Sequence, residues 1–251
     1  MRFSMRVLGF SGGFPAAGRA TSGYLVQIGN KNILVDCGSG VLSELQKYIS
    51  ISQIDAIILT HLHHDHISDM GVLQYALQMH KKKGELIEPI PLYITDRPQD
   101  TYDRVISGEH FAVHHINDNK VFDIFGVKVS FVTTIHPVPC FAVRIDYESK
   151  SIVYSSDTSY FSDFSRFAQD ADLLVLDCGA LESDKKAGNL HMTPKECFEI
   201  YSSSQAKRVV LSHLIPYYSI SDTVKEASSF GIWPFEIPLI GSEYILKGEK
   251  K

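Results

Sequence analysis

The sequence predicts an α+β protein in which two β-sheets pack face to face, with helices on the outside. Three observations lead to this prediction. Predicted strands fall into an early and a late group, predicted helices are interleaved with both groups, and no low-complexity linker or abrupt change of composition divides the 251 residues. A chain of this length has room for a sizeable core. We therefore expect a single domain spanning residues 1–251.

Ten segments are predicted to be strands, because each is short, rich in β-branched or aromatic residues, and bounded by Gly, Pro, Asn or Asp. They are residues 6–10, 24–28, 32–35, 56–60, 92–95, 127–133, 142–147, 152–155, 173–176 and 208–212. Residues 56–61 (Ala-Ile-Ile-Leu-Thr-His) also resemble residues 208–213 (Arg-Val-Val-Leu-Ser-His). Both segments predict a buried strand that delivers a histidine at its C-terminal end, although a match this short can arise by chance.

Six segments show helical spacing of apolar residues or a helix-start signal. They are residues 41–49, 67–80, 100–107, 160–168, 194–203 and 222–229. The fifth has the clearest start, because Thr193 provides a capping hydroxyl, Pro194 suits the first turn, and Glu196 places a carboxylate there.

The composition and charge of the chain exclude some classes of binding partner. The hydrophobic share is 44%, the charged share is 21%, and the net charge is -5. A protein that binds long duplex nucleic acid usually has a basic surplus, so no such partner is expected. No apolar run reaches the length of a membrane span, and the first residues lack the apolar core of a signal peptide. The four cysteines form no CxxC pair, which favours reduced thiols and a cytoplasmic location.

The most informative segment is Thr60-His61-Leu62-His63-His64-Asp65-His66, which follows an apolar strand and precedes a helix. In extended backbone, His61 and His63 project to the same side. Asp65 and His66 fall in the turn into the helix and can face a second, nearby point. Imidazoles and a short carboxylate are zinc ligands, and they also suit manganese or iron. The spacing therefore favours two neighbouring metal ions, with zinc as the expected metal.

Three further candidate ligands follow predicted strands: His136, Asp157 and His213. The simplest assignment gives one ion the side chains of His61, His63 and His136. The other ion receives Asp65, His66 and His213. Asp157 bridges the two ions together with a hydroxide, since two metals about 3.5–4 Å apart generate hydroxide at neutral pH. Asp65 is also a candidate catalytic residue, because its carboxylate can orient that hydroxide.

The ordered set His-x-His-x-Asp-His, His136, Asp157 and His213 resembles the metallo-β-lactamase superfamily. The resemblance includes the glycine-rich start at Leu8–Gly13 and the segment Leu34-Val35-Asp36-Cys37-Gly38. It covers nearly the whole chain and implies an αβ/βα four-layer sandwich of two mixed sheets flanked by helices. It also implies that Asp36 supports the metal site without ligating it, and that the protein is a homodimer.

Within that superfamily the sequence is most similar to the ribonuclease Z and phosphodiesterase branch. The segment His191-Met192-Thr193 resembles a His-x-Thr segment of ribonuclease Z, which implies that His191 contacts the scissile phosphate. Ribonuclease Z has a long arm that grips tRNA between its third and fourth metal motifs. Only twenty residues separate His136 from Asp157, so that arm has no room here. We therefore expect a small phosphodiester substrate, such as a cyclic nucleotide or an RNA 3′ end.

Other functions share parts of this pattern. Thioester or lactone hydrolases, of the glyoxalase II and lactonase types, use the same seven ligands and remain the alternative. A di-iron redox protein carries an acid at the position of His63. Hydrolysis of β-lactams is disfavoured by Asp157 at the bridging position. A metal-bound but inactive interaction domain does not need the complete ligand set.

For several residues, a purely structural role is an alternative to a functional role. Asp157 can cap the helix predicted from residue 160, and His191 can be a buried or capping histidine. His64 faces away from its neighbours by alternation. The pair His114 and His115 is expected in a loop over residues 111–119, as a solvated pair or at the mouth of the site. The basic run 81–83 suits a helix C-terminus or RNA contact, and Cys140 is expected to be a buried side chain.

Overall fold

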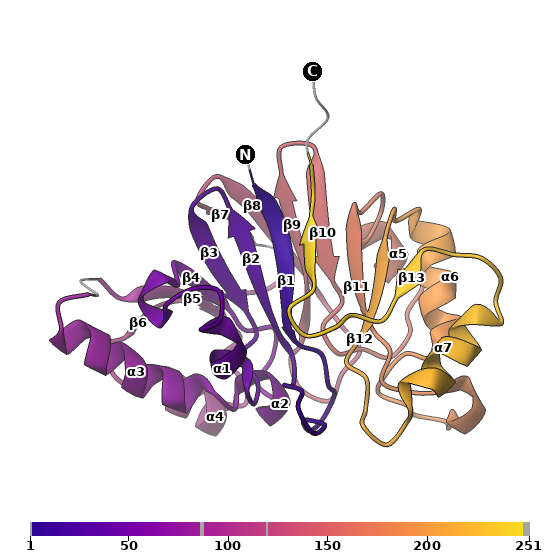
Figure 1. The fold of residues 1–251 in the computed structure, drawn as a ribbon, viewed down its shortest axis with the longest axis horizontal. Helices are drawn as coiled ribbons and strands as arrows, with labels where there is room; N and C mark the ends of the chain where they lie inside the picture. Colours follow the sequence, from indigo (N-terminus) through magenta and orange to yellow (C-terminus); the bar gives the residue numbers. More distant parts are fainter. Residues whose placement is uncertain (1, 86–87, 119, 248–251) are drawn as a thin grey trace. The chain divides into compact units, whose positions relative to one another are not determined.

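A computed structural model of the chain describes residues 2–85, 88–118 and 120–247. The chain divides into two compact units. Unit 1 comprises Met1–Ile116 and Ile240–Ile245, and unit 2 comprises Asn117–Leu239 and Leu246–Lys251. Each unit contains one seven-stranded mixed sheet, and most of their strands are labelled in Figure 1.

The sheet of unit 1 is antiparallel at one end and parallel at the other. Its strand order is β14 (Glu243–Ile245), β1 (Phe3–Gly9), β2 (Gly23–Ile28), β3 (Lys31–Val35), β4 (Ala56–Ile58), β5 (Ile90–Ile94) and β6 (Phe111–His115). Neighbours pair antiparallel from β14 to β3 and parallel from β3 to β6. The parallel strands β3 and β4 are almost entirely buried, as expected for continuous apolar segments.

The sheet of unit 2 repeats this arrangement. Its strand order is β7 (Val121–Ile124), β8 (Val127–Thr133), β9 (Phe141–Tyr147), β10 (Lys150–Tyr154), β11 (Leu173–Asp177), β12 (Val209–Ser212) and β13 (Phe235–Glu236). Neighbours again pair antiparallel over the first four strands and parallel over the last four. The counterpart of β4 in this order is β11. Residues 56–61 include β4, and residues 208–213 include β12. Their sequence similarity therefore relates two strands that are not counterparts in the structural repeat.

The same ion pair marks the same place in both sheets. Lys31 begins β3, and its Nζ lies 2.7 Å from Oδ1 of Asp55, which directly precedes β4. Lys150 begins β10, and its Nζ lies 3.0 Å from Oδ1 of Asp172, which directly precedes β11. The second carboxylate oxygen accepts a backbone N–H in each case, from Asn32 at 2.9 Å and from Ser151 at 3.0 Å. The repeat thus extends to individual hydrogen bonds.

Each unit has its own helices, and those of unit 1 bury apolar side chains in one cluster with the sheet of that unit. In unit 1 these are α1 (Val41–Leu45), α2 (His64–Ile67), α3 (Met70–Lys82) and α4 (Gln99–Val105). Leu45 of α1 and Leu73 of α3 belong to one buried apolar cluster with Leu34 and Ile57 of the sheet. In unit 2 they are α5 (Phe164–Phe167), α6 (Pro194–Ser204) and α7 (Ile220–Ser228). Two short 3₁₀ helices, η1 (Ile51–Gln53) and η2 (Glu182–Asp184), complete the described elements.

All ten predicted strands are confirmed, with boundaries shifted by at most a few residues. The predicted start of α6 is also confirmed, because Thr193 and Glu196 form a reciprocal capping box with Pro at the first turn. Two helix predictions were too long, since α1 ends at Leu45 and α5 covers only Phe164–Phe167. The segment 67–80 is not one helix, because it contains the last residue of α2, a turn and most of α3. The loop expected over residues 111–119 was wrong for Phe111–His115, which forms strand β6, and residue 119 lies outside the described residues.

Among the residues that the structure describes, none of the helices combines the length and the apolar character needed to span a membrane.

Candidate metal centre

Asp36 organises the end of the parallel pair β3 and β4. It follows β3 directly, with a positive φ of 56°, and is fully buried. Its carboxylate accepts hydrogen bonds from Thr60 N at 2.9 Å and from Thr60 Oγ1 at 3.0 Å. It also accepts one from Nδ1 of His66 at 2.7 Å. Because Nδ1 carries the proton, the lone pair of His66 lies on Nε2, the arrangement found in metal-binding histidines.

The first donor set consists of His61, His63, Asp65 and His66, all within unit 1. The His61 ring centroid lies 4.8 Å from that of His63 and 4.1 Å from that of His66. Nε2 of His66 lies 3.6 Å from Oδ2 of Asp65. Asp65 and His66 lie inside α2 rather than in a turn before a helix, which corrects the expected start of that helix. The structure therefore brings the four predicted side chains of this unit together.

Two glycines fix the position of Asp65. The backbone N–H of Gly13, in the glycine-rich segment after β1, donates to Oδ2 of Asp65 at 2.7 Å. Gly38 lies against the backbone of the same residue, since a Cβ on Gly38 would stand 2.0 Å from the Asp65 carbonyl oxygen. A side chain at residue 38 is therefore excluded while α2 keeps its position.

The second donor set consists of His136, Asp157 and His213, all within unit 2. These residues follow the alternate strands β8, β10 and β12. Oδ2 of Asp157 lies 3.3 Å from Nε2 of His213 and 3.9 Å from Nε2 of His136. The two side chains of that closer pair are 2% exposed. Asp157 does not cap a helix at residue 160, because α5 begins later, at Phe164.

The sequence reading missed Asp177, which supports this set as Asp36 supports the first. Oδ2 of Asp177 accepts hydrogen bonds from Thr158 N at 2.9 Å and from Nδ1 of His191 at 2.8 Å. Oδ1 lies 3.5 Å from Nδ1 of His213. Burial by itself raises the pKa of Asp177, but the neighbouring His191 and His213 outweigh burial and hold that pKa below its usual range. The signal for this residue was its place at the end of an apolar strand, in a segment Asp-Cys-Gly like that at Asp36.

His191 lies over this second set. Its ring stacks on that of His213, with centroids 4.8 Å apart and an interplanar angle of 29°. Desolvation lowers the pKa of His191, but the Asp177 carboxylate outweighs it and raises that pKa above the usual value. Gly179 leaves room for this ring, since a Cβ there would stand 3.0 Å from Cγ of His191. The side chains of Asp177, His191 and His213 thus form one connected group.

The two donor sets have the chemistry of a metal site. Each combines imidazoles with one carboxylate, and in each a buried aspartate contacts Nδ1 of a histidine. Such outer carboxylates orient the ring and raise its basicity toward a metal. Buried imidazole and carboxylate groups of this kind suit zinc, manganese or iron.

The other candidate residues make contacts within the fold or lie outside the two donor sets. His114 and His115 lie in β6, where His114 stacks on Tyr93 at 4.9 Å and Nε2 of His115 lies 2.8 Å from the Tyr102 hydroxyl. Cys140 is buried as expected, with Sγ 3.2 Å from Oγ of Ser156. The basic run 81–83 closes α3 as expected. His64 is exposed and belongs to neither donor set.

Comparison with known proteins identifies the family. The family model described as the β-lactamase superfamily domain matches residues 31–214, well over half of the chain. The chain belongs to the metallo-β-lactamase superfamily. A relative in this superfamily is the probable metallo-hydrolase YhfI of Bacillus subtilis, which is 36% identical over 243 residues, covering 96% of this chain and 98% of YhfI. This relationship supports the conclusion that the chain is a metal-dependent hydrolase.

Solved structures confirm the α+β class and the metallo-β-lactamase fold. The crystal structure of YhfI matches with a TM-score of 0.90 and 34% identity, covering 97% of this chain and 99% of YhfI. Human short-form tRNase Z matches with a TM-score of 0.76 and 20% identity, over 96% and 98% of the two chains. A diphosphatase of the PhnP family matches with a TM-score of 0.75 and 21% identity, over 98% of each chain. The last two likenesses concern the fold alone.

Proposed function

We propose that this metallo-β-lactamase superfamily hydrolase cleaves small phosphodiesters, such as a cyclic nucleotide or an RNA 3′ end. The observation that carries the proposal is the placement of His191 beside the second donor set, held by Asp177 at 2.8 Å. The raised pKa of His191 favours the imidazolium, which is a suitable partner for a phosphate oxygen. The fold likeness to tRNase Z and to the diphosphatase agrees with this substrate class.

The proposal includes the metal ligands. The seven side chains of the first and second donor sets, Asp157 among them, would hold two zinc ions in one hydrolase domain over residues 1–251. Ligand type and superfamily membership support this assignment. Zinc held there would supply Lewis-acid chemistry, lowering the pKa of water and offsetting negative charge on the attacked phosphate.

The protein's own groups then have separate roles. Asp65, fixed by the Gly13 N–H, orients the attacking water and also serves as a ligand. His191 donates a hydrogen bond to a phosphate oxygen and delivers a proton to the leaving oxygen. Asp177 is a positioning residue, because its contacts with Nδ1 of His191 and Nδ1 of His213 orient both rings.

The test is a substrate comparison on zinc- or manganese-loaded protein. Bis-p-nitrophenyl phosphate is assayed beside a thioester and a lactone, each with and without prior treatment with a chelator. Metal-dependent turnover of the phosphodiester supports the proposal, and 2′,3′-cyclic nucleotides and short RNAs with defined 3′ ends then distinguish the two substrate types. Turnover of the thioester or lactone alone would reject the phosphodiesterase assignment and favour the glyoxalase II or lactonase type.

The native metal, location and oligomer belong to the same proposal. The four cysteines, all within the described residues, are buried and outside any disulfide, which agrees with a reducing cytoplasm. Metal analysis of protein purified without added metal tests zinc against manganese and iron. Light scattering coupled to size exclusion tests the expected homodimer.

A further inference from the structure

A cavity in unit 1 lies beside the metal-binding motif but outside the first donor set. It has a volume of about 200 Å³ and is bordered by the start of α3, the end of α2 and helix α4. Its buried wall is formed by Ile67, Met70 and Val105 together with Thr101. Gln74 fixes α3 to α4, because its Nε2 donates to the carbonyl oxygens of Arg104 at 3.2 Å and of Val105. The cavity is therefore a preformed space between two joined helices.

The rim of the cavity is cationic on the side of α4. Arg104 is exposed there, and its Nη2 donates to Oγ1 of the buried Thr101 at 3.1 Å. The Asp100 carboxylate lies 3.6 Å from the same guanidinium, but both groups are exposed, so this pair is weak. His64 lines the same cavity, and no hydrogen bond or ion pair of its imidazole is found among residues 2–85, 88–118 and 120–247. A guanidinium with five donors retains capacity for an anionic ligand.

Gly71 leaves the wall of the cavity open at the start of α3. This residue lies in the first turn of α3 and does not have a positive φ, so the conformational freedom of glycine is not used. Glycine destabilises a helix relative to alanine. No heavy atom lies within 4 Å of a Cβ built on Gly71, so close packing does not require glycine either. What the missing side chain provides is space at the wall of the cavity.

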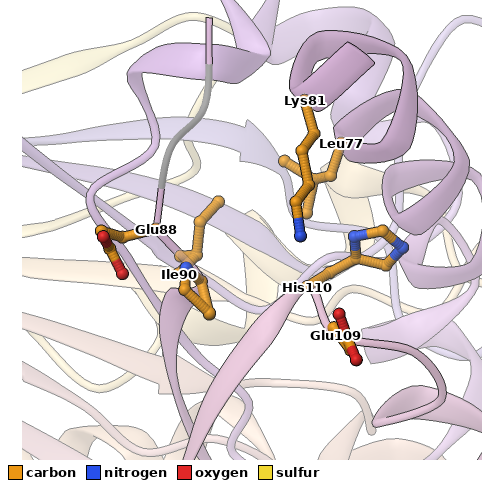
Figure 2. Close-up of a pocket in the computed structure, with 7 residues that line it drawn as sticks. Leu77, Lys81, Glu88, Ile90, Glu109 and His110 are labelled. Atoms are coloured by element: carbon orange, nitrogen blue, oxygen red, sulfur yellow. The ribbon is translucent and has the colours of Figure 1, made fainter. Parts of the chain in front are cut away.

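We propose that this cavity binds a small molecule that combines an apolar body, about the size of one aromatic ring, with one carboxylate or phosphate group. The apolar body packs on Ile67, Met70 and Val105, and the anionic group contacts Arg104. Figure 2 shows a different hollow at the other end of α3, where Lys81 extends toward His110 and where Glu88 and Glu109 add negative charge. That hollow holds only about 10 Å³, which is too small for such a ligand.

The probe is 4-bromobenzoate, added to the zinc-loaded full-length protein. Calorimetry measures its affinity, and the anomalous signal of bromine in soaked crystals locates it. Gly71→Leu fills the cavity and is expected to abolish binding there. Arg104→Gln is expected to weaken binding about tenfold or more, because a charge-assisted hydrogen bond is lost. Val72→Leu, an exposed neighbour on α3, and Lys81→Gln, which removes a cation from the other hollow, are expected to leave the affinity unchanged.

Four results would overturn the inference. The cavity would not be the binding site if bromine density were confined to the metal ligands or if Gly71→Leu had unchanged affinity. It would have no specificity for an anionic group if 4-bromotoluene bound equally well. A change of molecular mass in Gly71→Leu would instead assign the cavity to a side chain of a second copy of this chain, and would equally reject a small-molecule site. None of these measurements uses turnover, so they are independent of the proposed phosphodiesterase activity.

Discussion

The carboxylate of Asp177 accepts a hydrogen bond from Nδ1 of His191 at 2.8 Å, and the same carboxylate lies 3.5 Å from Nδ1 of His213. One buried acid therefore orients both a proposed metal ligand and a proposed phosphate contact. The two roles can be separated by substitution, because only His213 belongs to the second donor set.

Replacing His191 with alanine is expected to lower kcat on a phosphodiester by about 10²–10⁴-fold, the usual contribution of a general acid. Zinc content is expected to stay the same, since His191 is not among the proposed ligands. Elemental analysis and steady-state kinetics check both statements. His110→Ala, a substitution in unit 1 outside both donor sets, serves as the control. Full activity of the His191 variant would refute its assigned role.

Replacing Asp36 with asparagine is expected to reduce zinc affinity about 10–100-fold, because the carboxylate that orients His66 at 2.7 Å is lost. Competition with a chromogenic chelator measures that affinity. Asp55→Asn is the matched control. It breaks the ion pair with Lys31, which lies at the opposite end of β3 and β4. We expect the control to lower stability and keep zinc affinity; equal loss of affinity in both variants would argue for a general effect on folding.

Replacing Gly38 with alanine is expected to destabilise unit 1 by roughly 1–3 kcal/mol, as overpacking of a tight contact does. The added Cβ would stand 2.0 Å from the Asp65 carbonyl oxygen and 2.2 Å from Oγ1 of Thr21, so α2 must shift. Zinc content is expected to fall with stability. Gly71→Ala is the comparison, because its Cβ meets no atom within 4 Å and a helical alanine is favoured. Urea denaturation distinguishes the two, and equal stability of the variants would contradict the packing argument.

The pH dependence of stability is expected to include a contribution from Asp172. Burial raises the pKa of this carboxyl, but hydrogen bonds from Lys207 and Lys150 outweigh burial and lower it. A folded-state pKa below the unfolded value stabilises the protein above the unfolded pKa, and this stabilisation disappears as the pH falls through the folded pKa. Asp172→Asn is therefore expected to destabilise by about 1–3 kcal/mol at pH 7, and by less at low pH.

Urea denaturation of wild type and Asp172→Asn between pH 7 and pH 3 measures this difference. Asp170→Asn provides the control, since Asp170 is exposed and, among the described residues, its carboxylate accepts a side-chain hydrogen bond only from its neighbour Gln169. A difference between wild type and Asp172→Asn that stays constant over the whole pH range would show that the charge of Asp172 is not responsible.

How much of the fold could be predicted depends on where a strand lies in its sheet. The ten predicted strands include every central strand, because strands with neighbours on both sides are buried and form apolar runs. The four missed strands, β6, β7, β13 and β14, are the edge strands of the two sheets. Their residues are largely exposed or half-buried, so they lack the apolar pattern that a single sequence can reveal.

The candidate site likewise contains residues that the sequence could predict and one that it could not. His61, His63, Asp65 and His66 were predictable because four donors occur within six positions, and His136, Asp157 and His213 because each follows a predicted strand. Asp177 also lies at the end of a strand, but one aspartate has no spacing that marks it. Its importance depends on its contacts with His191 and His213, which come from distant parts of unit 2. Those contacts exist only after the sheet has formed.

The lysine–aspartate pairs at the beginning of β3 and β10 bear on the ancestry of the chain. Six strands of each sheet, β1–β6 and β8–β13, share one order and one pattern of directions, with the same ion pair at the same place, as duplication of a half-length unit would produce. The proposed metal ligands do not follow that repeat: unit 1 supplies them after β4, whereas unit 2 supplies them after β8, β10 and β12. The beginnings of these strands are thus alike in the two halves, whereas the segments after the strand ends differ and supply different proposed ligands.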